Sequence, residues 1–463
     1  MHTFHTLSAP VVPLLFASCL VANLLVLDSC GPSASTDDEP ARYRILVSTD
    51  IGGTDPDDNQ SMTHLMMYSD LFDLEGLVSS PSYGEGSKEE ILRMIDLYER
   101  DYPQLARHAP ALMTPDSLRA ITKQGRKGGA PLAGYDTPTE GSDWIVTCAR
   151  RDDSRPLYVL VWGALEDVAQ ALHDAPDIAD RIRIYWIGGP NKKWGVNAYA
   201  YIAEHHPDVW FIENNATYRG IFTDNNRQEY HQSYTGLDAQ PADSLGTGYY
   251  DYAIRGAGVL GDDFINYYQG VVKMGDTPSV LYMMHGDPAD PTTDSWGGRF
   301  VSFDHSSRYV YHRQLTAQDT VAAYGIIEIW MDGPEQPYMT VGTPCLTLTT
   351  DRQDWDGYYM GEGRYLVRYC PKGPWTHPYT ISSAIPGLQA EGAFTAVVGW
   401  PGKPQATDYP LGAHWYTDCP DSALYDDGRW QGVQTQLRWR EAALLDWAER
   451  WAWLRDDESP VAN

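Results

Sequence analysis

An apolar run that ends in a crowd of carboxylates constrains this chain more than any other feature. Residues 45–47 (Ile-Leu-Val) predict a buried strand that ends at Asp50. The following loop is rich in Gly and Pro, and it carries three further carboxylates: Asp55, Asp57 and Asp58. Residues 62–66 then place apolar side chains at helical spacing. A strand end, an acidic loop and a helix start form the crevice in which open α/β sheets bind their ligands.

These four carboxylates allow two interpretations. Acidic side chains at the start of a helix cap free backbone N–H groups, and the helix dipole favours their charge. Carboxylates that crowd a crevice repel one another unless a cation joins them, and oxygen ligands suit Ca²⁺ or Mg²⁺ rather than zinc. Capping is the simpler explanation for any one of them. For four carboxylates within nine positions we favour a metal site.

Composition excludes one class of partner and leaves another open. The chain has 463 residues, which is too long for one typical domain, and its formal net charge is −29. Nucleic-acid binding needs a basic face, so a phosphate-backbone partner is disfavoured. The 16 Trp and 31 Tyr residues are compatible with stacking on sugar rings, but also with core packing.

The N-terminal segment predicts export. Residues 11–27 are almost entirely apolar, and Cys30 and a polar stretch follow, as in a lipoprotein signal that is acylated at its cysteine. A single membrane anchor is the alternative, although 17 residues are few for a span. We expect a periplasmic or cell-surface lipoprotein that touches the membrane only through its lipid. Disulfides can form there, and Cys345 and Cys370 on predicted strands either pair or stay as buried thiols.

The rest of the chain changes character twice. Up to about residue 257, short apolar strands alternate with amphipathic helices, which predicts a mostly parallel sheet flanked by helices. Residues 320–400 contain short strands punctuated by Gly, Pro and Asp, which favours an antiparallel sandwich. Residues 438–454 predict a helix whose Trp side chains lie at core spacing. We therefore predict an α/β fold with an inserted β-sandwich, divided into a signal and tether (1–41), an α/β domain (42–305), the insert (306–412) and a C-terminal completion of the α/β domain (413–463).

Several ordered motifs resemble a known family. The segment VSTDIGGTDPDDNQ (47–60) resembles the N-terminal Asp-rich motif of nucleoside hydrolases. It is closer still to a nucleoside-hydrolase-like family of bacterial cellulose-binding proteins, which also carries segments like VWGALEDVAQAL (161–172), WFIENNATYRGIF (210–222) and SWGGRF (295–300). Residues 315–400 resemble instead the Ig-like domain that precedes many glycoside hydrolase catalytic domains.

The resemblance implies roles for individual residues. It implies that Asp50 and Asp58 ligate Ca²⁺, that Asp50 also takes a proton from the attacking water, and that Asp57 binds a substrate hydroxyl. A backbone carbonyl near Ile187 would complete part of the metal shell. The last ligand of the family, in a His-Asp-Pro motif, has its nearest counterpart at Asp287.

The sequence also offers candidates for substrate binding. Candidate substrate-binding residues are Asn191, Asn197, Trp296 and Arg299. Trp296, like Trp194, offers a stacking face, although a packing role for either is equally compatible with the sequence. The loop after Asp50 is longer than in nucleoside hydrolases, and their Gly-Pro-Leu-Thr-Asn segment is replaced by Gly-Ala-Leu-Glu-Asp (163–167). These departures affect nucleoside specificity more than metal binding.

Two functions remain open from the sequence. One is a Ca²⁺-dependent hydrolase of N- or O-glycosidic bonds, acting on a nucleoside or on carbohydrate from polysaccharide breakdown. The other is a non-catalytic polysaccharide-binding lipoprotein that keeps the same fold. A phosphoester hydrolase is a third possibility, but few basic residues lie near the acidic loop.

Overall fold

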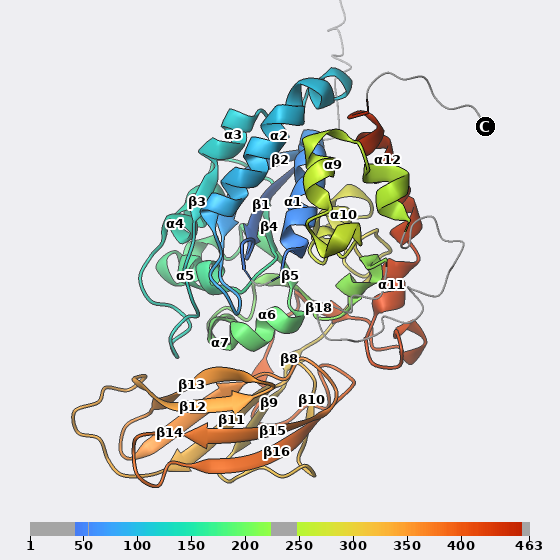
Figure 1. Ribbon diagram of the computed structural model, residues 1–463. Helices are drawn as coiled ribbons and strands as arrows, with labels where there is room; N and C mark the ends of the chain where they lie inside the picture. Colours follow the sequence, from blue (N-terminus) through green and yellow to red (C-terminus); the bar gives the residue numbers. More distant parts are fainter. Residues whose placement is uncertain (1–41, 54, 224–247, 456–463) are drawn as a thin grey trace, which may run out of the picture. The chain divides into compact units, whose positions relative to one another are not determined.

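The computed structural model describes residues 42–53, 55–223 and 248–455 (Figure 1). The predicted export segment and Cys30 lie outside the described residues. All the described residues belong to one compact unit. In the described part of the chain, no helix combines the length and the apolar character that crossing a bilayer requires.

A mostly parallel sheet forms the centre of the α/β domain. Within the described residues it has eight strands in the order β3-β2-β1-β4-β5-β6-β18-β7, and all neighbours are parallel except β18 and β7. The strands are β1 (Tyr43–Thr49), β2 (Phe72–Ser79), β3 (Thr122–Gln124), β4 (Leu157–Val161), β5 (Ile182–Ile187), β6 (Trp210–Asn214), β7 (Phe300–Ser302) and β18 (Trp415–Asp418). The apolar runs therefore fold as the buried parallel strands that the sequence predicts.

Helices cover both faces of this sheet. Alternate side chains of β1 point to opposite sides, so that Leu46 belongs to one buried cluster and Ile45 and Val47 belong to another. The helices on the Ile45 side are α1 (Asp57–Met67), α2 (Lys88–His108), α9 (Gly258–Phe264), α10 (Thr277–Met284) and α12 (Arg440–Ala452). The helices on the Leu46 side are α4 (Glu140–Ala149), α5 (Glu166–Asp174) and α7 (Val196–His205). Trp447 and Trp451 of α12 are fully buried, which confirms their predicted packing role.

A second sheet forms the inserted β domain. Its eight described strands follow the order β10-β16-β15-β12-β13-β14-β11-β9, mostly antiparallel. They are β9 (Arg308–Tyr311), β10 (Thr320–Ala322), β11 (Ile326–Asp332), β12 (Pro344–Thr350), β13 (Gln353–Tyr359), β14 (Arg364–Tyr369), β15 (Thr376–Ser382) and β16 (Ala390–Val397). The backbone N–H of Ala322 donates to Tyr309 Oη at 3.0 Å, so the two outer strands approach each other. This near-barrel is consistent with the Ig-like insert that the sequence predicts.

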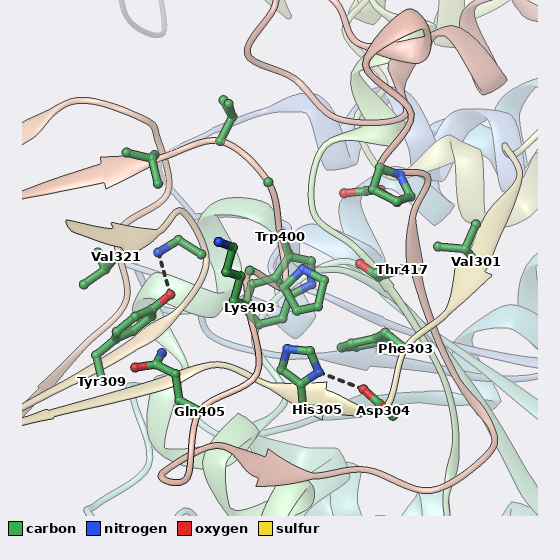
Figure 2. Close-up of a pocket in the computed structure, with 18 of the residues that line it drawn as sticks. Val301, Phe303, Asp304, His305, Tyr309, Val321, Trp400, Lys403, Gln405 and Thr417 are labelled. Atoms are coloured by element: carbon green, nitrogen blue, oxygen red, sulfur yellow. Dashed lines mark hydrogen bonds and ion pairs between the residues drawn. The ribbon is translucent and has the colours of Figure 1, made fainter.

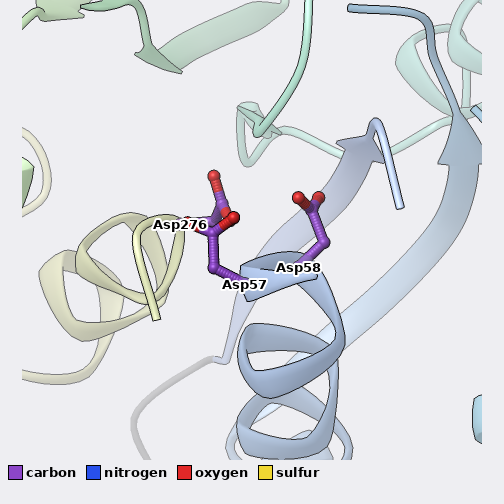
Figure 3. Close-up of side chains that lie close together, drawn as sticks. All are labelled: Asp57, Asp58 and Asp276. Carbon is purple, nitrogen blue, oxygen red and sulfur yellow. The ribbon is translucent and has the colours of Figure 1, made fainter. Parts of the chain in front are cut away.

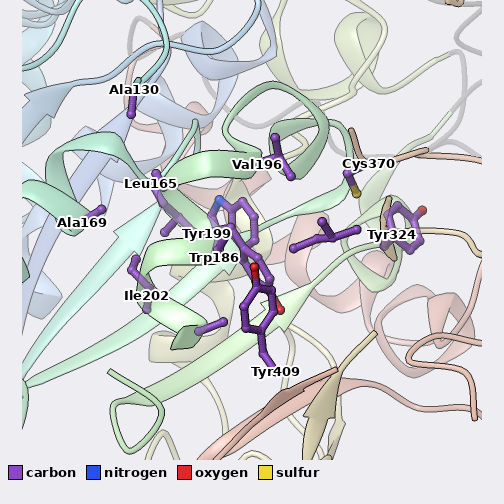
Figure 4. Close-up of a cluster of buried hydrophobic side chains, with 14 of the residues drawn as sticks. Ala130, Leu165, Ala169, Trp186, Val196, Tyr199, Ile202, Tyr324, Cys370 and Tyr409 are labelled. Carbon is purple, nitrogen blue, oxygen red and sulfur yellow. The ribbon is translucent and has the colours of Figure 1, made fainter. Parts of the chain in front are cut away.

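The insert and the α/β domain share a buried core. Figure 4 shows Trp186 and Tyr199 of the α/β domain in the same cluster as Tyr324 and Cys370 of the insert. The Trp186 and Tyr199 rings are stacked, with centroids 5.5 Å apart. All four cysteines of the described residues have free thiols, and burial raises the pKa of Cys370 to about 12. Of the two alternatives for Cys345 and Cys370, the structure has the free thiols.

Candidate metal centre

Three elements place acidic side chains in one cavity. Asp50 follows β1 directly, Asp57 and Asp58 lie in the first turn of α1, and Asp276 immediately precedes α10. The cavity has a volume of about 50 Å³, and its wall also includes Ile187 at the end of β5. It therefore lies at the carboxyl ends of the parallel strands, where α/β sheets bind their ligands.

Three of the carboxylates form a compact, buried cluster (Figure 3). Asp57, Asp58 and Asp276 each place one oxygen within 4.8 Å of the others. Their side chains are buried, with exposed fractions of 8%, 2% and 4% in that order. Asp50 joins this cluster, because its carboxyl shares a hydrogen bond with that of Asp58. Carboxyl groups so close to one another cannot all ionise unless a cation lies among them.

Neighbouring residues hold the cluster in place. Thr49 Oγ1 donates to Asp58, and the backbone N–H of Gly275 donates to Asp57 Oδ2 at 3.2 Å. The Lys273 ammonium forms an ion pair with Asp55 and lies 3.5 Å from Asp57 Oδ2. Lys273 thus neutralises part of the negative charge of Asp55 and Asp57.

The acidic side chains do not cap the helices that carry them. The N-cap residue of α1 is Pro56, and no side chain caps that helix. Asp276 occupies the N-cap position of α10, yet it makes no capping hydrogen bond. Its buried Oδ2 has no hydrogen-bond partner among the described residues. An N-cap aspartate usually satisfies free backbone N–H groups, so the orientation of Asp276 indicates another role for its carboxylate.

The electrostatics of the cluster fit a hard divalent cation. Burial raises the pKa of Asp50 to about 6. Burial and the charges of the neighbouring aspartates raise the pKa of Asp58 and of Asp276 well above the ordinary value. A bound cation would offset both effects, because it supplies positive charge and replaces water around the oxygens. Oxygen-only donors with one unpaired buried oxygen match the preference of Ca²⁺ or Mg²⁺.

Most of the residues predicted for the metal centre lie at this cavity. Asp50, Asp57, Asp58, Ile187 and Asn191 all line it. Asn191 Nδ2 donates to the carbonyl oxygens of Trp162 and Ile187, both at 3.0 Å. That pair of hydrogen bonds fixes the end of β5 against the end of β4.

Asp287 requires a correction, because it does not reach the cluster. Its side chain is exposed, and Oδ1 accepts a hydrogen bond from the backbone N–H of Ala289 at 2.9 Å. The late carboxylate of the site is Asp276 instead. Asp287 was predicted because the Asp-Pro dipeptide at residues 287–288 matches the end of the His-Asp-Pro motif. The Asp-Thr-Pro sequence at residues 276–278, before an apolar run, is a helix-start signal, but it predicts a capping residue and does not link Asp276 to the acidic loop.

Three predicted substrate-binding residues do not line this cavity. Trp296 stacks on His285, with ring centroids 4.9 Å apart, on another part of the surface. Arg299 lies 3.8 Å from Asp294, with which it forms an ion pair. Asn197 lines a neighbouring cavity, which Trp194 and Ser82 connect to the acidic one.

A larger cavity lies elsewhere (Figure 2), and among the described residues its acidic side chains do not form a cluster. It has a volume of about 830 Å³, and its wall includes Phe303, His305 and Trp400. Asp418 also lines it, but this carboxylate already accepts three backbone N–H groups from residues 215–217, at 2.8 to 3.1 Å. We therefore take the smaller acidic cavity as the candidate site.

Comparison with known proteins identifies the family. The family model described as "Cellulose-binding Sde182, nucleoside hydrolase-like domain" matches residues 44–300, which is over half of the chain. The chain belongs to this family. The resemblance that the Asp-rich motif indicated is thereby confirmed, and the matched residues include Asp50, Asp57, Asp58 and Asp276.

The chain is also similar in part to solved structures. One is a nucleoside hydrolase-related protein from Saccharophagus degradans that is described as associated with carbohydrate metabolism. It is 19% identical to this chain with a TM-score of 0.45, and the match covers 78% of this chain and 100% of that one. A purine-preferring ribonucleoside hydrolase from Gardnerella vaginalis is 13% identical, with a TM-score of 0.33, over 57% of this chain and 84% of that one. A search of curated proteins gave no match.

Proposed function

We propose that the chain is a Ca²⁺-dependent hydrolase of glycosidic bonds. The observation that carries the proposal is the cluster of Asp57, Asp58 and Asp276, in which Asp276 Oδ2 has no hydrogen-bond partner among the described residues. Asp57, Asp58 and Asp276 would hold the cation, with Asp50 beside them. When bound, Ca²⁺ would orient a water molecule and lower its pKa. We further propose export as a lipoprotein, supported by the apolar run before Cys30.

The side chains around the cavity fit the remaining requirements of hydrolysis. Asp50 lines the cavity beside Asp58 and would accept a proton from the attacking water. The water oxygen would bond to the anomeric carbon as the glycosidic bond breaks, and the leaving group would take its proton from solvent. The carboxylates would stabilise the oxocarbenium-like transition state. Asp57, fixed by Gly275 and Lys273, would accept a hydrogen bond from a sugar hydroxyl.

A non-catalytic carbohydrate-binding protein is the second candidate. The description of the family as cellulose-binding favours it. The ion pairs of Lys273 with Asp55 and Asp57 favour it too, because an ammonium beside the carboxylates already supplies part of the charge that a metal would bring. Under this proposal the same cavity would hold a sugar without turnover.

Two matched substitutions test the metal centre by calorimetric titration with Ca²⁺. Asp276→Asn should weaken Ca²⁺ affinity at least about 100-fold, because even residues that only orient ligands commonly cost about 10 to 100-fold. Asp287→Asn is the control, since it makes the same change at an exposed aspartate, and it should leave the affinity unchanged. Equal affinities for the two variants would overturn the assignment of Asp276.

Turnover separates the two candidate functions. Nitrophenyl glycosides and nucleosides should be hydrolysed by the wild-type chain in Ca²⁺, and hydrolysis should cease in chelator and in Asp276→Asn. Absence of turnover for all of these substrates, together with retention of the chain on cellulose or xylan in the presence of chelator, would favour the non-catalytic protein instead.

A further inference from the structure

A second cavity opens beside the acidic one. Its volume is about 260 Å³, against about 50 Å³ for the acidic cavity, and the two share Ser82 and Trp194 in their walls. Pockets for small ligands commonly measure about 300 to 1,000 Å³. The acidic cavity alone is too small for such a ligand, so a bound molecule must extend into the second cavity.

The inserted β domain builds one wall of this second cavity. The α/β domain contributes Tyr83, Trp194 and Asn197, and the insert contributes neighbouring side chains of β13 and Arg368 of β14. Those β13 side chains are Asp354, Trp355, Asp356 and Tyr358. Residues on the insert therefore lie beside the proposed catalytic carboxylates.

Direct contacts fix that wall to the α/β domain. Trp355 Nε1 donates to the Lys193 carbonyl at 3.2 Å, and the Lys193 ammonium lies 4.8 Å from the Trp355 ring centroid. Arg368 Nη1 donates to Asn197 Oδ1 at 3.1 Å, and Asn197 Nδ2 donates to Tyr358 Oη at 3.0 Å. The side chains of the wall are thus held in position before any ligand arrives, which lowers the entropic cost of binding.

The chemistry of the wall suits a neutral sugar. Tyr83 is half exposed, and its ring lies 6.0 Å from that of Trp194, so aromatic faces are available at the junction of the two cavities. Asp354 and Asp356 are exposed on β13 and offer acceptors for hydroxyl groups. These carboxylates, with those of the acidic cavity, repel an anion such as a phosphorylated sugar.

We propose that the insert forms sugar-binding subsites of the substrate cleft, and that the substrate is an oligosaccharide of neutral sugars. The inference rests on the proposed function, because it places the reacting sugar at the acidic cavity. The following sugar units extend across Trp194 and Tyr83 to Trp355 and Asp356. The insert is then a determinant of substrate length and not only a spacer.

Substrate length provides the test. Hydrolysis of a nitrophenyl monosaccharide is compared with that of β-1,4-linked gluco-, xylo- and manno-oligosaccharides, from the disaccharide to the hexasaccharide. Tyr83→Ala and Asp356→Ala should lower kcat/KM for the longer substrates about 10-fold, as expected for loss of one stacking or hydrogen-bonding contact. The nitrophenyl monosaccharide, which reaches fewer of the proposed subsites, should lose much less of its kcat/KM than the hexasaccharide.

Two control variants exclude general effects. Tyr338→Ala removes a tyrosine that is 99% exposed on the same insert, and Asp332→Ala removes an exposed aspartate at the end of β11. Neither residue lines the cleft, so both variants should behave like wild type. Equal losses on short and long substrates, or no loss on any, would overturn the inference.

Binding measurements keep the inference independent of turnover. If no substrate is hydrolysed, the proposed function fails, yet calorimetric binding of the hexasaccharides that Tyr83→Ala weakens would still support the cleft. If nucleosides alone are hydrolysed and the cleft variants hydrolyse them normally, the proposed function stands and the inference is wrong.

Discussion

At the scale of single residues, two buried carboxyl groups each have one oxygen without a hydrogen-bond partner among the described residues. They are Asp276 Oδ2 and Glu166 Oε2. Asp276 lies in a cluster of acids, where a cation would satisfy all of them. Glu166 is buried beside Asp167 at the start of α5, and its Oε1 accepts only a weak hydrogen bond from Ala130 N–H at 3.3 Å. A metal ion would satisfy the unpaired oxygen of Asp276, whereas a bound proton makes the buried carboxyl group of Glu166 neutral.

Glu166 predicts a dependence of stability on pH. Burial, with a smaller effect from the charge of Asp167, raises its pKa to about 8, although the hydrogen bond from Ala130 and the charge of Arg126 act in the opposite direction. The folded chain therefore holds this proton more tightly than the unfolded chain, whose Glu pKa is about 4.3. The stabilisation is complete below that value and is lost as the pH rises through about 8.

The measurement compares wild type with Glu166→Gln in urea between about pH 5 and pH 9. Wild type should lose stability relative to Glu166→Gln by at most about 1.4 kcal/mol per pH unit in this window. Glu335→Gln, at an exposed glutamate, should follow wild type. A constant difference between wild type and Glu166→Gln across this range would contradict the prediction.

The site residues differ in how far sequence could find them. Asp50, Asp57 and Asp58 lie within one strand-loop-helix unit, so local pattern is enough. Asp276 reaches them only because α10 packs near α1, and that tertiary contact leaves no spacing rule in the sequence. Lys273 was missed for the same reason, since its ion pairs with Asp55 and Asp57 span more than 200 positions.

At the scale of elements, a short helix positions part of the site. Helix α6 (Gly189–Trp194) carries Asn191 and Trp194, and it has only six residues. An ion pair anchors it to the sheet, because Lys192 Nζ lies 2.7 Å from Glu213 Oε1 of β6 and both side chains are fully buried. The Lys192 ammonium also lies 3.7 Å from the centroid of the Tyr199 ring and 3.8 Å from that of Trp400.

Breaking this ion pair should be costly. Lys192→Met leaves Glu213 buried without its cation, and the free energy of unfolding should fall by about 3 to 5 kcal/mol. Adding Glu213→Gln should recover much of the loss, because a neutral amide is cheaper to bury than a carboxylate. Equilibrium denaturation in urea measures both, with the exposed Lys127→Met as the matched control. A loss below about 1 kcal/mol in Lys192→Met would show that the pair does not anchor the helix.

The strands and helices were largely predictable, and the exceptions have a common cause. The segment at residues 157–163 folds as β4 (Leu157–Val161), and the segment at 345–350 folds as β12 (Pro344–Thr350). Strand β13 (Gln353–Tyr359) was not predicted from pattern, because Trp355 is the only apolar side chain among its first five residues. Strands whose side chains form a ligand cleft lack the simple alternation of core strands.

At the scale of the whole molecule, the insert is part of one cooperative structure. A single buried cluster contains Val159 and Trp186 of the central sheet together with Ile327 and Phe394 of the insert. Hydrogen bonds from Arg368 and Trp355 to the α/β domain add to this shared core. An accessory module on a flexible tether would lack such contacts.

This shared core predicts the thermal behaviour of the chain. Scanning calorimetry of the full-length protein should give one transition, with calorimetric and van't Hoff enthalpies in agreement. Replacing residues 308–397 by a flexible linker should lower the free energy of unfolding of the remaining domain by more than about 4 kcal/mol. The reason is that large apolar side chains of the α/β domain, now buried against the insert, become exposed to water. Two well-separated transitions in the intact chain would contradict the prediction.

The connection between the two sheets has a consequence for evolution. The chain leaves the central sheet after β7 and returns to it at β18, and these strands are antiparallel neighbours, with Ser302 opposite Tyr416. The segment between β7 and β18 is therefore one insertion in the α/β fold, and its two ends lie side by side in the sheet. An insertion with adjacent ends can become longer or shorter, or be replaced, without any change in the order of the sheet strands, so the wall that it contributes to the second cavity can change while the acidic cluster stays where it is.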